Sequence, residues 1–496
     1  RYRIVSIMKI LFKESDELLL TAQPDEKIRI GDVILSESVL SQVIEIKFLT
    51  TNSIEAYILR KSLIPEENTT ESIQPEISGM MGTLLDQKLL VTKIRGHLED
   101  GENGRRILKT GITDFNLSRE KTVPKKISAD ELFEILGLNF PDNTIAETLS
   151  ENKGFDFDLT KLELTLITGK KKSGKSYFAK RLLLRLIESG VFTLVLDVNQ
   201  EYQELGLDEN HQPNEYFKNF IVLDPTINDV NGNRRPLRIP LNEITAEDFI
   251  DYLEITTGPM SQAVFQCWRA LRNNQQFDLA DVSAWIDGVN ENGIRNVDNE
   301  MVRIALASRI RYAESQRFFG PLDVTNIVQG LRDGGALILS IGTLPNRIRR
   351  KLVRLVENWL RRLTALHGEV QLHAACLFLE EAQMYADTDN IVDLITRMRH
   401  LGVTPVFITN DPTTLPDELY ANIDNIVSFL FKNEKELNHV GRTGLLDVDT
   451  LSLLKTLEQQ QCLVVGEFTN GFPLFVKILR QDGVQMKGET RELIRE

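Results

Sequence analysis

The segment from residue 169 to residue 176 constrains the fold of this chain more than any other part of its sequence. It reads Gly-Lys-Lys-Lys-Ser-Gly-Lys-Ser and matches the pattern G-x-x-x-x-G-K-[ST]. An apolar run at residues 164–168 predicts a buried strand before it, and residues 175–189 predict a helix after it. Glycines let the backbone fold around an anion, toward which the free amides at a helix N-terminus point. The segment therefore predicts a phosphate-binding loop in an α/β fold.

The polar residues of this loop have expected roles. Lys175 should reach the β- and γ-phosphates of ATP, and Ser176 should bind Mg²⁺. Lys172 and the two lysines before it stand where small residues are common, so they either attract the nucleotide or are solvated. An exposed basic turn is the alternative explanation, and the flanking strand and helix argue against it. The expected nucleotide contacts are Gly169, Lys172, Ser173, Gly174, Lys175, Ser176 and Tyr177.

Two carboxylates, Glu380 and Glu381, follow a hydrophobic strand predicted at residues 375–379. In ATPases with a phosphate loop, the first acid supports Mg²⁺ and the second polarises the attacking water. Glu380 stands where aspartate is usual, and a water in the metal shell can absorb the extra methylene. We expect Glu380 to be a metal ligand and Glu381 to be the general base. Two solvated acids at a strand end are the alternative.

The strand predicted at residues 404–409 is followed by Asn410. If this strand neighbours the acidic one, the Asn410 side chain lies beside the γ-phosphate and orients water as a sensor. Asn410 also precedes Asp411-Pro412, so the alternative is that it is a turn residue.

A helix predicted at residues 391–401 ends at Gly402, a typical helix C-cap. Arg397 and Arg399 lie in its last turn, where cations interact favourably with the helix dipole. In ring-shaped ATPases this region faces the nucleotide of the neighbouring subunit, where an arginine stabilises transition-state charge. We expect one of these two arginines to have that role.

The first part of the chain is rich in short β segments. Up to residue 118 they predict a small β-barrel, with a mobile loop at residues 65–78. Residues 119–150 form a connector with one helix, which Ser128 caps three residues before Glu131. The predicted barrel segments are residues 27–35, 42–48, 54–59 and 88–93.

The larger part of the chain, residues 151–480, alternates strands with helices, as an α/β domain does. A mostly helical insertion is predicted at about residues 245–335, because it carries no signal for a central strand. Charged residues 481–496 predict a frayed C-terminal tail. Besides the strand at 164–168, the predicted strands are residues 192–197, 336–340, 375–379 and 404–409.

The charge balance limits the partners of this chain. It has 72 acidic and 58 basic residues and a net charge of −14, whereas a surface that wraps DNA is normally basic. Any DNA contact should therefore be local, such as the lining of a pore.

Three cysteines without a CxxC pair argue against disulfides and a structural zinc, and fit a reducing cytoplasm. Neither a membrane-spanning apolar run nor a signal-peptide pattern occurs, so we expect a cytoplasmic chain without membrane contact.

Together these segments resemble the HerA family of hexameric DNA-translocating ATPases, which is related to FtsK. The resemblance covers most of the chain and is least specific in the helical insertion. Two segments distinguish this family from other P-loop ATPases, because they look like the family's D-x-x-x-E-Y and R-K-F-G. The matching segments are Gly31-Asp32, residues 169–176, Leu196-Asp-Val-Asn-Gln-Glu-Tyr202, Glu380-Glu-Ala-Gln383, Arg399-His-Leu-Gly402 and Thr409-Asn-Asp-Pro412.

The resemblance implies a RecA-like P-loop ATPase core preceded by a small N-terminal β-barrel. It also implies that Asp197 and Glu201 line the nucleotide site and that Arg399 acts on the nucleotide of the neighbouring subunit. The departures bear on the rate of hydrolysis more than on nucleotide binding. They are Glu380 for Asp, Gln383 for His, His400 for Lys and Asn410 for Gln.

For partners, the resemblance implies a homohexameric ring with nucleotide at each interface and double-stranded DNA in the channel. Family members work with a nuclease, and diverged bacterial members accompany effector enzymes in antiphage defence. The many Asn and Gln residues favour such a bacterial assembly over a thermophile protein. We therefore expect an ATP-driven translocase of duplex DNA with a partner nuclease or effector. A nucleotide-regulated scaffold for an effector, and a nucleotide switch without DNA, are the alternatives.

Two basic stretches are candidate DNA contacts. Residues 231–236, Asn-Gly-Asn-Arg-Arg-Pro, are predicted to be a flexible loop that can project into a pore or lie on plain surface. The second stretch is one face of a helix, for which solvated surface is the favoured explanation. Its basic residues are Arg347, Arg350, Lys351 and Arg354.

Overall fold

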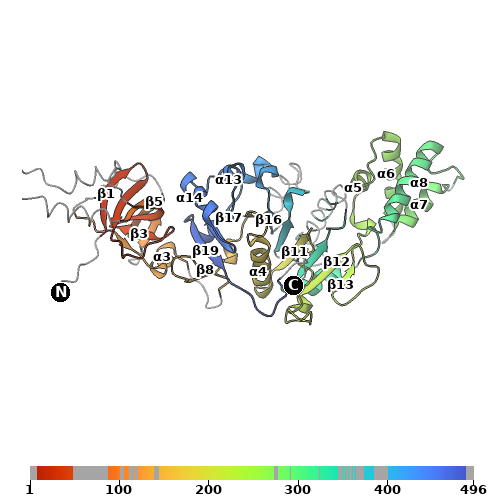
Figure 1. Cartoon of the computed structure of the whole chain (residues 1–496). Coiled ribbons are helices and arrows are strands. Elements are labelled where there is room, and N and C mark those ends of the chain that lie inside the picture. The colour runs from red at the N-terminus through yellow and green to blue at the C-terminus, as the bar shows by residue number, and fades with distance from the viewer. Residues whose placement is uncertain are drawn as a thin grey trace, which may run out of the picture. The chain divides into compact units, whose positions relative to one another are not determined.

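The contacts in the computed structural model divide the chain into two compact units (Figure 1). The first unit consists of Arg1–Lys161, Leu430–Lys432 and Gly444–Leu479, and the second of Leu162–Phe429, Asn433–Thr443 and Arg480–Glu496. The structure describes residues 8–48, 88–100, 106–110, 117, 121–138, 144–272, 277–290, 292–322, 324–344, 375–384 and 402–486, with positions 349, 352, 356, 360, 364, 372, 374 and 400. Within these ranges, no helix has both the length and the apolar character needed to span a bilayer.

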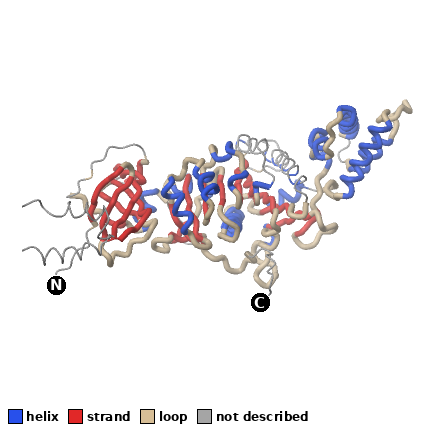
Figure 2. The backbone as a smooth tube through the Cα atoms, turned by 45° about the horizontal axis from the view of Figure 1, so that its top comes forward, coloured by secondary structure: helices blue, strands red, loops and turns tan. Residues whose placement is uncertain are grey.

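An antiparallel sheet of half-barrel form occupies the first unit (Figure 2). Its order is β1-β2-β5-β4-β3-β7, and β6 pairs with β5. The pairing of β4 with β5 shifts register at two places, and such bulges bend a strand and increase its twist. The strands are β1 Lys9–Glu14, β2 Glu17–Ala22, β3 Val33–Ser36, β4 Val39–Phe48, β5 Lys88–Asp100, β6 Arg106–Lys109 and β7 Lys125–Lys126. The expectation of an N-terminal barrel-like sheet is confirmed in this form.

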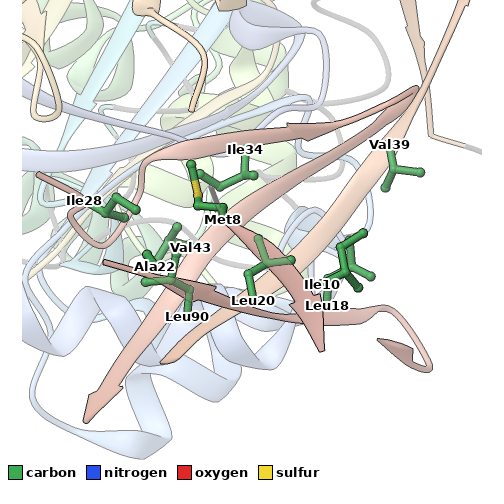
Figure 3. Close-up of a cluster of buried hydrophobic side chains, with 10 residues drawn as sticks. All are labelled: Met8, Ile10, Leu18, Leu20, Ala22, Ile28, Ile34, Val39, Val43 and Leu90. Atoms are coloured by element: carbon green, nitrogen blue, oxygen red, sulfur yellow. The ribbon is translucent and has the colours of Figure 1, made fainter. Parts of the chain in front are cut away.

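A cluster of apolar side chains packs against this sheet (Figure 3). Alternate residues of a strand face the same side, so Leu18, Leu20 and Ala22 on β2 all enter the cluster. Its ten members are Met8, Ile10, Leu18, Leu20, Ala22, Ile28, Ile34, Val39, Val43 and Leu90.

The predicted barrel strands match the structure unequally. Residues 42–48 and 88–93 lie within β4 and β5. The segment at 27–35 is extended only from Val33, because the Asp32 carboxylate accepts the Arg29 N–H and closes a turn before it. Residues 54–59 and the loop at 65–78 lie outside the described residues.

The predicted connector helix is α3, Ala129–Leu136. The Ser128 hydroxyl accepts the Glu131 N–H at 3.1 Å, as a helix N-cap does. The first unit also contains α14 Val448–Leu453 and a small antiparallel group in the order β18-β19-β8-β9. These strands are β8 Ala146–Thr148, β9 Gly154–Phe155, β18 Gln461–Gly466 and β19 Leu474–Ile478. Their pairing explains why contacts group residues 444–479 with the N-terminal part of the chain.

A parallel sheet forms the centre of the second unit, in the order β13-β12-β14-β11-β15-β16-β10-β17. Its strands are β10 Thr165–Thr168, β11 Phe192–Asp197, β12 Phe220–Asp224, β13 Arg234–Pro236, β14 Ala336–Ser340, β15 Ala375–Glu380, β16 Val403–Thr409 and β17 Asn425–Phe429. The central ones are buried on both faces, which explains their continuous apolar runs. All five strands predicted for this sheet are present, and the α/β fold is confirmed.

Helices surround this sheet and form the insertion. Helix α4, Lys175–Glu188, follows β10 as predicted. In the insertion, rings from α5, α6 and the segment after α8 pack together: Phe249 meets Phe319 edge to face and lies tilted against Trp268. The helices of the insertion are α5 Ala246–Tyr252, α6 Gly258–Leu271, α7 Leu279–Asp287, α8 Glu300–Ser315 and α9 Val324–Leu331. Two short helices, α12 Asp417–Tyr420 and α13 Glu434–Gly441, lie after β16 and β17.

Two segments expected to be mobile are ordered in part, at residues 234–236 and 481–486, and residues 487–496 lie outside the described residues. Within the predicted flexible loop at 231–236, Arg234–Pro236 is strand β13, and the Arg234 guanidinium binds the Asp224 carboxylate at 2.6 Å. The predicted frayed tail is also packed over residues 481–486, where Val484 is buried. Short edge strands and docked terminal segments obtain their backbone partners from distant residues, so the local sequence does not predict them.

Candidate nucleotide-binding site

Glycine is required at both ends of the phosphate loop. Gly169 has φ of +145°, and a Cβ at this position would lie 2.6 Å from the Phe429 Cβ on the neighbouring strand β17. Gly174 has φ of +122° and is the N-cap of α4 without any side-chain capping bond. The first amides of α4 are therefore available to an anion rather than to a side chain of the helix itself.

Lys175 is the charged centre of this loop. Its side chain is 7% exposed, and the ammonium donates to the carbonyl oxygens of Gly169 at 2.6 Å and Lys170 at 2.9 Å. Burial lowers the pKa of Lys175 to about 8, although the charges of Glu380 and Glu381 oppose this shift. The backbone thus folds around one ammonium group, which has donors ready for phosphate oxygens.

Ser173 and the lysines before it differ in environment. The Ser173 hydroxyl is buried and has no hydrogen-bond partner within the described residues, so it is a donor that a phosphate oxygen can satisfy. Lys170, Lys171 and Lys172 are all exposed, in agreement with solvated side chains. The Tyr177 hydroxyl accepts the Gln481 N–H at 2.6 Å and so joins the start of α4 to the C-terminal segment.

The two predicted metal ligands face each other. Glu380 is the last residue of β15, and its Oε1 accepts a weak hydrogen bond of 3.4 Å from the Ser176 hydroxyl. Burial raises the pKa of Glu380 to about 8, and the charges of Glu201 and Asp197 add to this effect. A divalent cation fits here, because hydroxyl and carboxylate oxygens are the ligands Mg²⁺ prefers and its charge would stabilise the ionised carboxylate.

Tyr202 binds the carboxylate oxygen of Glu380 that does not contact Ser176. Its hydroxyl donates to the Glu380 Oε2 at 3.0 Å, and the whole tyrosine side chain is buried. Asp197 positions this residue, because its carboxylate accepts the N–H groups of Glu201 and Tyr202, each at 3.0 Å. Burial raises the pKa of Asp197 to about 6, while these two amides lower it. Asp197 therefore acts on the loop backbone, and its carboxylate oxygens are occupied there.

Glu201 faces a buried lysine of helix α4. The Lys180 ammonium lies 3.7 Å from the Glu201 carboxylate and donates to the Met486 carbonyl at 3.1 Å. Burial lowers the pKa of Lys180, and the charges of Glu201 and Asp197 oppose that shift. The Lys180 ammonium thus offsets part of the negative charge of Glu201 and Asp197.

Side-chain amides surround the predicted general base. The Glu381 Oε1 accepts from the amides of Asn199 at 3.1 Å and Asn410 at 3.0 Å. Its Oε2 accepts from the Gln383 amide. Glu381 itself has φ of +51°, a left-handed conformation that is uncommon for a residue with a Cβ. We call Asn199, Gln383 and Asn410 the amide network of Glu381.

Thr409 sets the direction of this network. Its hydroxyl oxygen accepts the Asp411 N–H at 3.0 Å, so its proton is donated to the Gln383 Oε1 at 2.7 Å. With its oxygen occupied, Gln383 must present its NH₂ group to Glu381. Strand β16 thereby determines how the carboxylate at the end of β15 is held, since the two strands pair in parallel.

Some of the predicted site residues lie together at one edge of the sheet, and others lie outside the described part of the chain. Lys175, Ser176, Glu380, Glu381 and Asn410 gather at the carboxyl ends of neighbouring parallel strands. The sequence assigned no role to Tyr202, Asn199 or Thr409, although all three lie in segments that carry the family resemblance. The following predicted residues lie outside the described part of the chain: Arg397, Arg399, Arg347, Arg350, Lys351 and Arg354.

A family model described as the central domain of helicase HerA matches residues 166–358. This part of the chain is therefore similar to a HerA central domain. The match includes the phosphate loop and the segment through Tyr202 and ends before Glu380. With the loop and the acidic pair on one edge of a parallel sheet, the chain has the arrangement of residues that is typical of a P-loop ATPase.

Solved structures of similar fold come from several systems. VirB4 of Thermoanaerobacter pseudethanolicus is 15% identical with a TM-score of 0.48, over 69% of this chain and 98% of that one. The bacterial conjugative coupling protein TrwB is 12% identical with a TM-score of 0.48, over 73% and 93%. The genome packaging NTPase B204 from Sulfolobus turreted icosahedral virus 2 is 12% identical with a TM-score of 0.33, over 65% and 100%. No curated protein matches the chain.

Proposed function

We propose that this HerA-type chain hydrolyses ATP with Mg²⁺ and uses the reaction to translocate double-stranded DNA. One observation carries the ATPase part: the Lys175 ammonium and the amide-held Glu381 carboxylate lie on one edge of a single parallel sheet. A nucleotide held by the loop then presents its terminal phosphate to a carboxylate. Hydrolysis of a phosphoanhydride needs this pairing of charge stabilisation and an oriented base.

The residues divide the chemistry between them. The ammonium of Lys175 and the free amides of α4 stabilise negative charge on the β- and γ-phosphates. Glu381 accepts the proton of the attacking water, while Asn410 orients that water or the phosphate. Ser176 and Glu380 hold Mg²⁺, which when bound neutralises charge on the phosphate oxygens. Tyr202 keeps one Glu380 oxygen occupied, so the other is directed toward Ser176.

The assembly part of the proposal rests on the family. We infer a homohexameric ring in which Arg399 reaches the nucleotide of the neighbouring subunit and duplex DNA lies in the channel. A partner nuclease or other effector, in DNA processing or antiphage defence, would use the translocated DNA. A nucleotide-regulated scaffold for such an effector is the second candidate, which the net charge of −14 favours because it weakens contact with DNA.

Hydrolysis is tested first with single substitutions. Lys175→Ala should abolish turnover, because the loop loses its only buried ammonium contact to the phosphates. Glu381→Gln should bind ATP with affinity near that of the wild type but turn over at least about 100-fold more slowly. Wild-type turnover by Glu381→Gln would remove Glu381 from the base role.

Translocation is tested with the assembled protein and its partner. Duplex DNA should raise the rate of ATP hydrolysis, whereas the scaffold predicts an unchanged rate and an effector that co-purifies even with Lys175→Ala. Arg399→Ala subunits mixed with Lys175→Ala subunits should recover turnover if the arginine acts across an interface. An inactive mixture, from two variants that each assemble, would contradict this role.

A further inference from the structure

A pair of arginines lies at the edge of the second unit, apart from the nucleotide loop. Residues 237–240 run beside residues 318–320, where the Ile239 N–H donates to the Phe318 carbonyl at 2.8 Å and the Gly320 N–H to the Ile239 carbonyl at 3.1 Å. This pairing brings Arg238 and Arg317 together from segments far apart in the sequence. The aliphatic part of Arg238 lies over Gly320, where an added Cβ would be 3.4 Å from the Arg238 Cδ.

Neutral groups are the hydrogen-bond partners of these two side chains. Arg238 donates to the carbonyl of Leu237 at 2.8 Å, and Arg317 to the Asn228 side-chain oxygen at 2.9 Å. Within the described ranges, no carboxylate lies at ion-pair distance from either guanidinium. Burial and the charge of Arg317 lower the pKa of Arg238, as expected for two cations without an acid between them.

The absence of an acid beside this pair is informative in a chain with 72 acidic and 58 basic residues. Two other arginines of the second unit have one, since Arg234 binds Asp224 at 2.6 Å and Arg303 binds Asp287 at 3.0 Å, whereas Arg309 donates to the Leu253 carbonyl at 3.2 Å. Two adjacent guanidiniums left without a counter-charge repel each other, and an external anion removes that repulsion. The neighbouring Arg235 Nε is also buried without a hydrogen-bond partner in the described structure.

The position of the pair excludes the bound nucleotide as that anion. It follows strand β13, whereas the phosphate loop follows β10, and six inter-strand steps separate these strands in the sheet. At ~4.8 Å per step the separation is roughly 29 Å. Both strands end at the same edge of the sheet, because all pairs between them are parallel. The arginine pair is therefore a cationic site, separate from the phosphate loop, on the nucleotide-binding edge.

We propose that Arg238 and Arg317 bind the phosphodiester backbone of duplex DNA. Guanidinium groups match phosphate oxygens with paired N–H donors and stay charged at every physiological pH. This inference rests on the proposed function, in which the chain acts on duplex DNA. This contact differs from the one predicted at the loop 231–236, in which Arg234 is neutralised by Asp224 and the Arg235 Nε is buried.

The test is a binding titration of a fluorescein-labelled 30-base-pair duplex by fluorescence anisotropy, at several salt concentrations between 50 and 200 mM. Arg238→Gln and Arg317→Gln should each weaken binding about 3- to 10-fold at the lowest salt. Each should also reduce the slope of log K against log salt by about one, because one phosphate contact is lost. Arg238→Lys should keep most of the salt slope, since it keeps the charge.

Arg332→Gln is the matched control, because it removes an exposed arginine of the same unit that is paired with Asp333. ATP turnover without DNA should match the wild type in every variant and so reports that the fold is intact. Wild-type affinity and salt slope in Arg238→Gln and Arg317→Gln, with DNA bound by the wild type, would overturn this site and leave the proposed function standing. No binding of the duplex by the wild type would overturn both.

Discussion

Replacing Tyr202 with phenylalanine removes one hydroxyl and leaves the shape of the side chain. In the wild type this hydroxyl donates to the Glu380 Oε2 at 3.0 Å, and both side chains are buried. The substitution leaves a buried carboxylate oxygen without this donor. The ionised form of Glu380 is then less stable, and this is the form that Mg²⁺ requires.

The size of the effect follows from the strength of the bond. A hydrogen bond to a charged group contributes about 1.5–3 kcal/mol. Each 1.4 kcal/mol corresponds to about tenfold in an equilibrium constant. The Mg²⁺ concentration for half-maximal activity should therefore rise about 10- to 100-fold in Tyr202→Phe, in the range expected for a group that orients a metal ligand. Turnover at saturating Mg²⁺ should remain within about threefold of the wild type.

The assay is a Mg²⁺ titration of ATP turnover at constant free ATP, supported by Mg²⁺-dependent binding of a fluorescent nucleotide. Tyr252→Phe is the control, because the Tyr252 hydroxyl is buried without a hydrogen-bond partner in the described residues. It removes the same atom and breaks no bond. If the Mg²⁺ curve of Tyr202→Phe coincides with that of Tyr252→Phe, the argument that Tyr202 orients a metal ligand is refuted.

Two further predictions concern the amide network and the first unit. Gln383→Ala should lower kcat about 10- to 100-fold with little change in KM, because Glu381 loses one oriented donor; an unchanged kcat would contradict a positioning role. Burial raises the pKa of Asp447, but Arg95 and the hydrogen bonds from Thr450 outweigh it and hold this pKa at about 2, below the unfolded value of 3.8. The carboxylate therefore stabilises the fold above pH 3.8 and loses its effect as pH falls through 2. Asp447→Asn, which keeps a capping oxygen for the Thr450 N–H, should therefore be about 1 kcal/mol less stable than the wild type at pH 7 after allowance for solvent screening. In chemical denaturation this difference should shrink to about half by pH 3, and a difference independent of pH would contradict the assignment.

Much of the nucleotide site can be read from local sequence. The loop at 169–176 is recognisable because its function demands glycine at positions with positive φ and one lysine at the helix start. Strands β10, β11 and β14–β16 are long apolar runs, since both faces are buried. Carboxylates at the end of such a strand in an α/β sheet point to the ligand edge, so Glu380 and Glu381 were accessible to the same reasoning.

Other features depend on partners far along the chain. The hydroxyl of Tyr202 reaches Glu380 over 178 positions, and Thr409 directs the Gln383 amide over 26. The edge strand Arg234–Pro236 and the docked residues 481–486 have polar sequences like those of loops. Their backbone groups find partners only after β12 and α4 are in place. The pairing of Arg238 with Arg317 arises in the same way.

The difference between the two groups has one physical origin. The backbone geometry of a phosphate loop, a helix cap or a buried strand depends mainly on the types of consecutive residues, so it can be predicted from them. A side chain that orients another, or a charge left without a counter-charge, depends on which segments the fold brings within about 3 Å of each other. The chemistry of the nucleotide loop thus follows from eight adjacent residues, whereas the orientation of its acids follows from long-range packing.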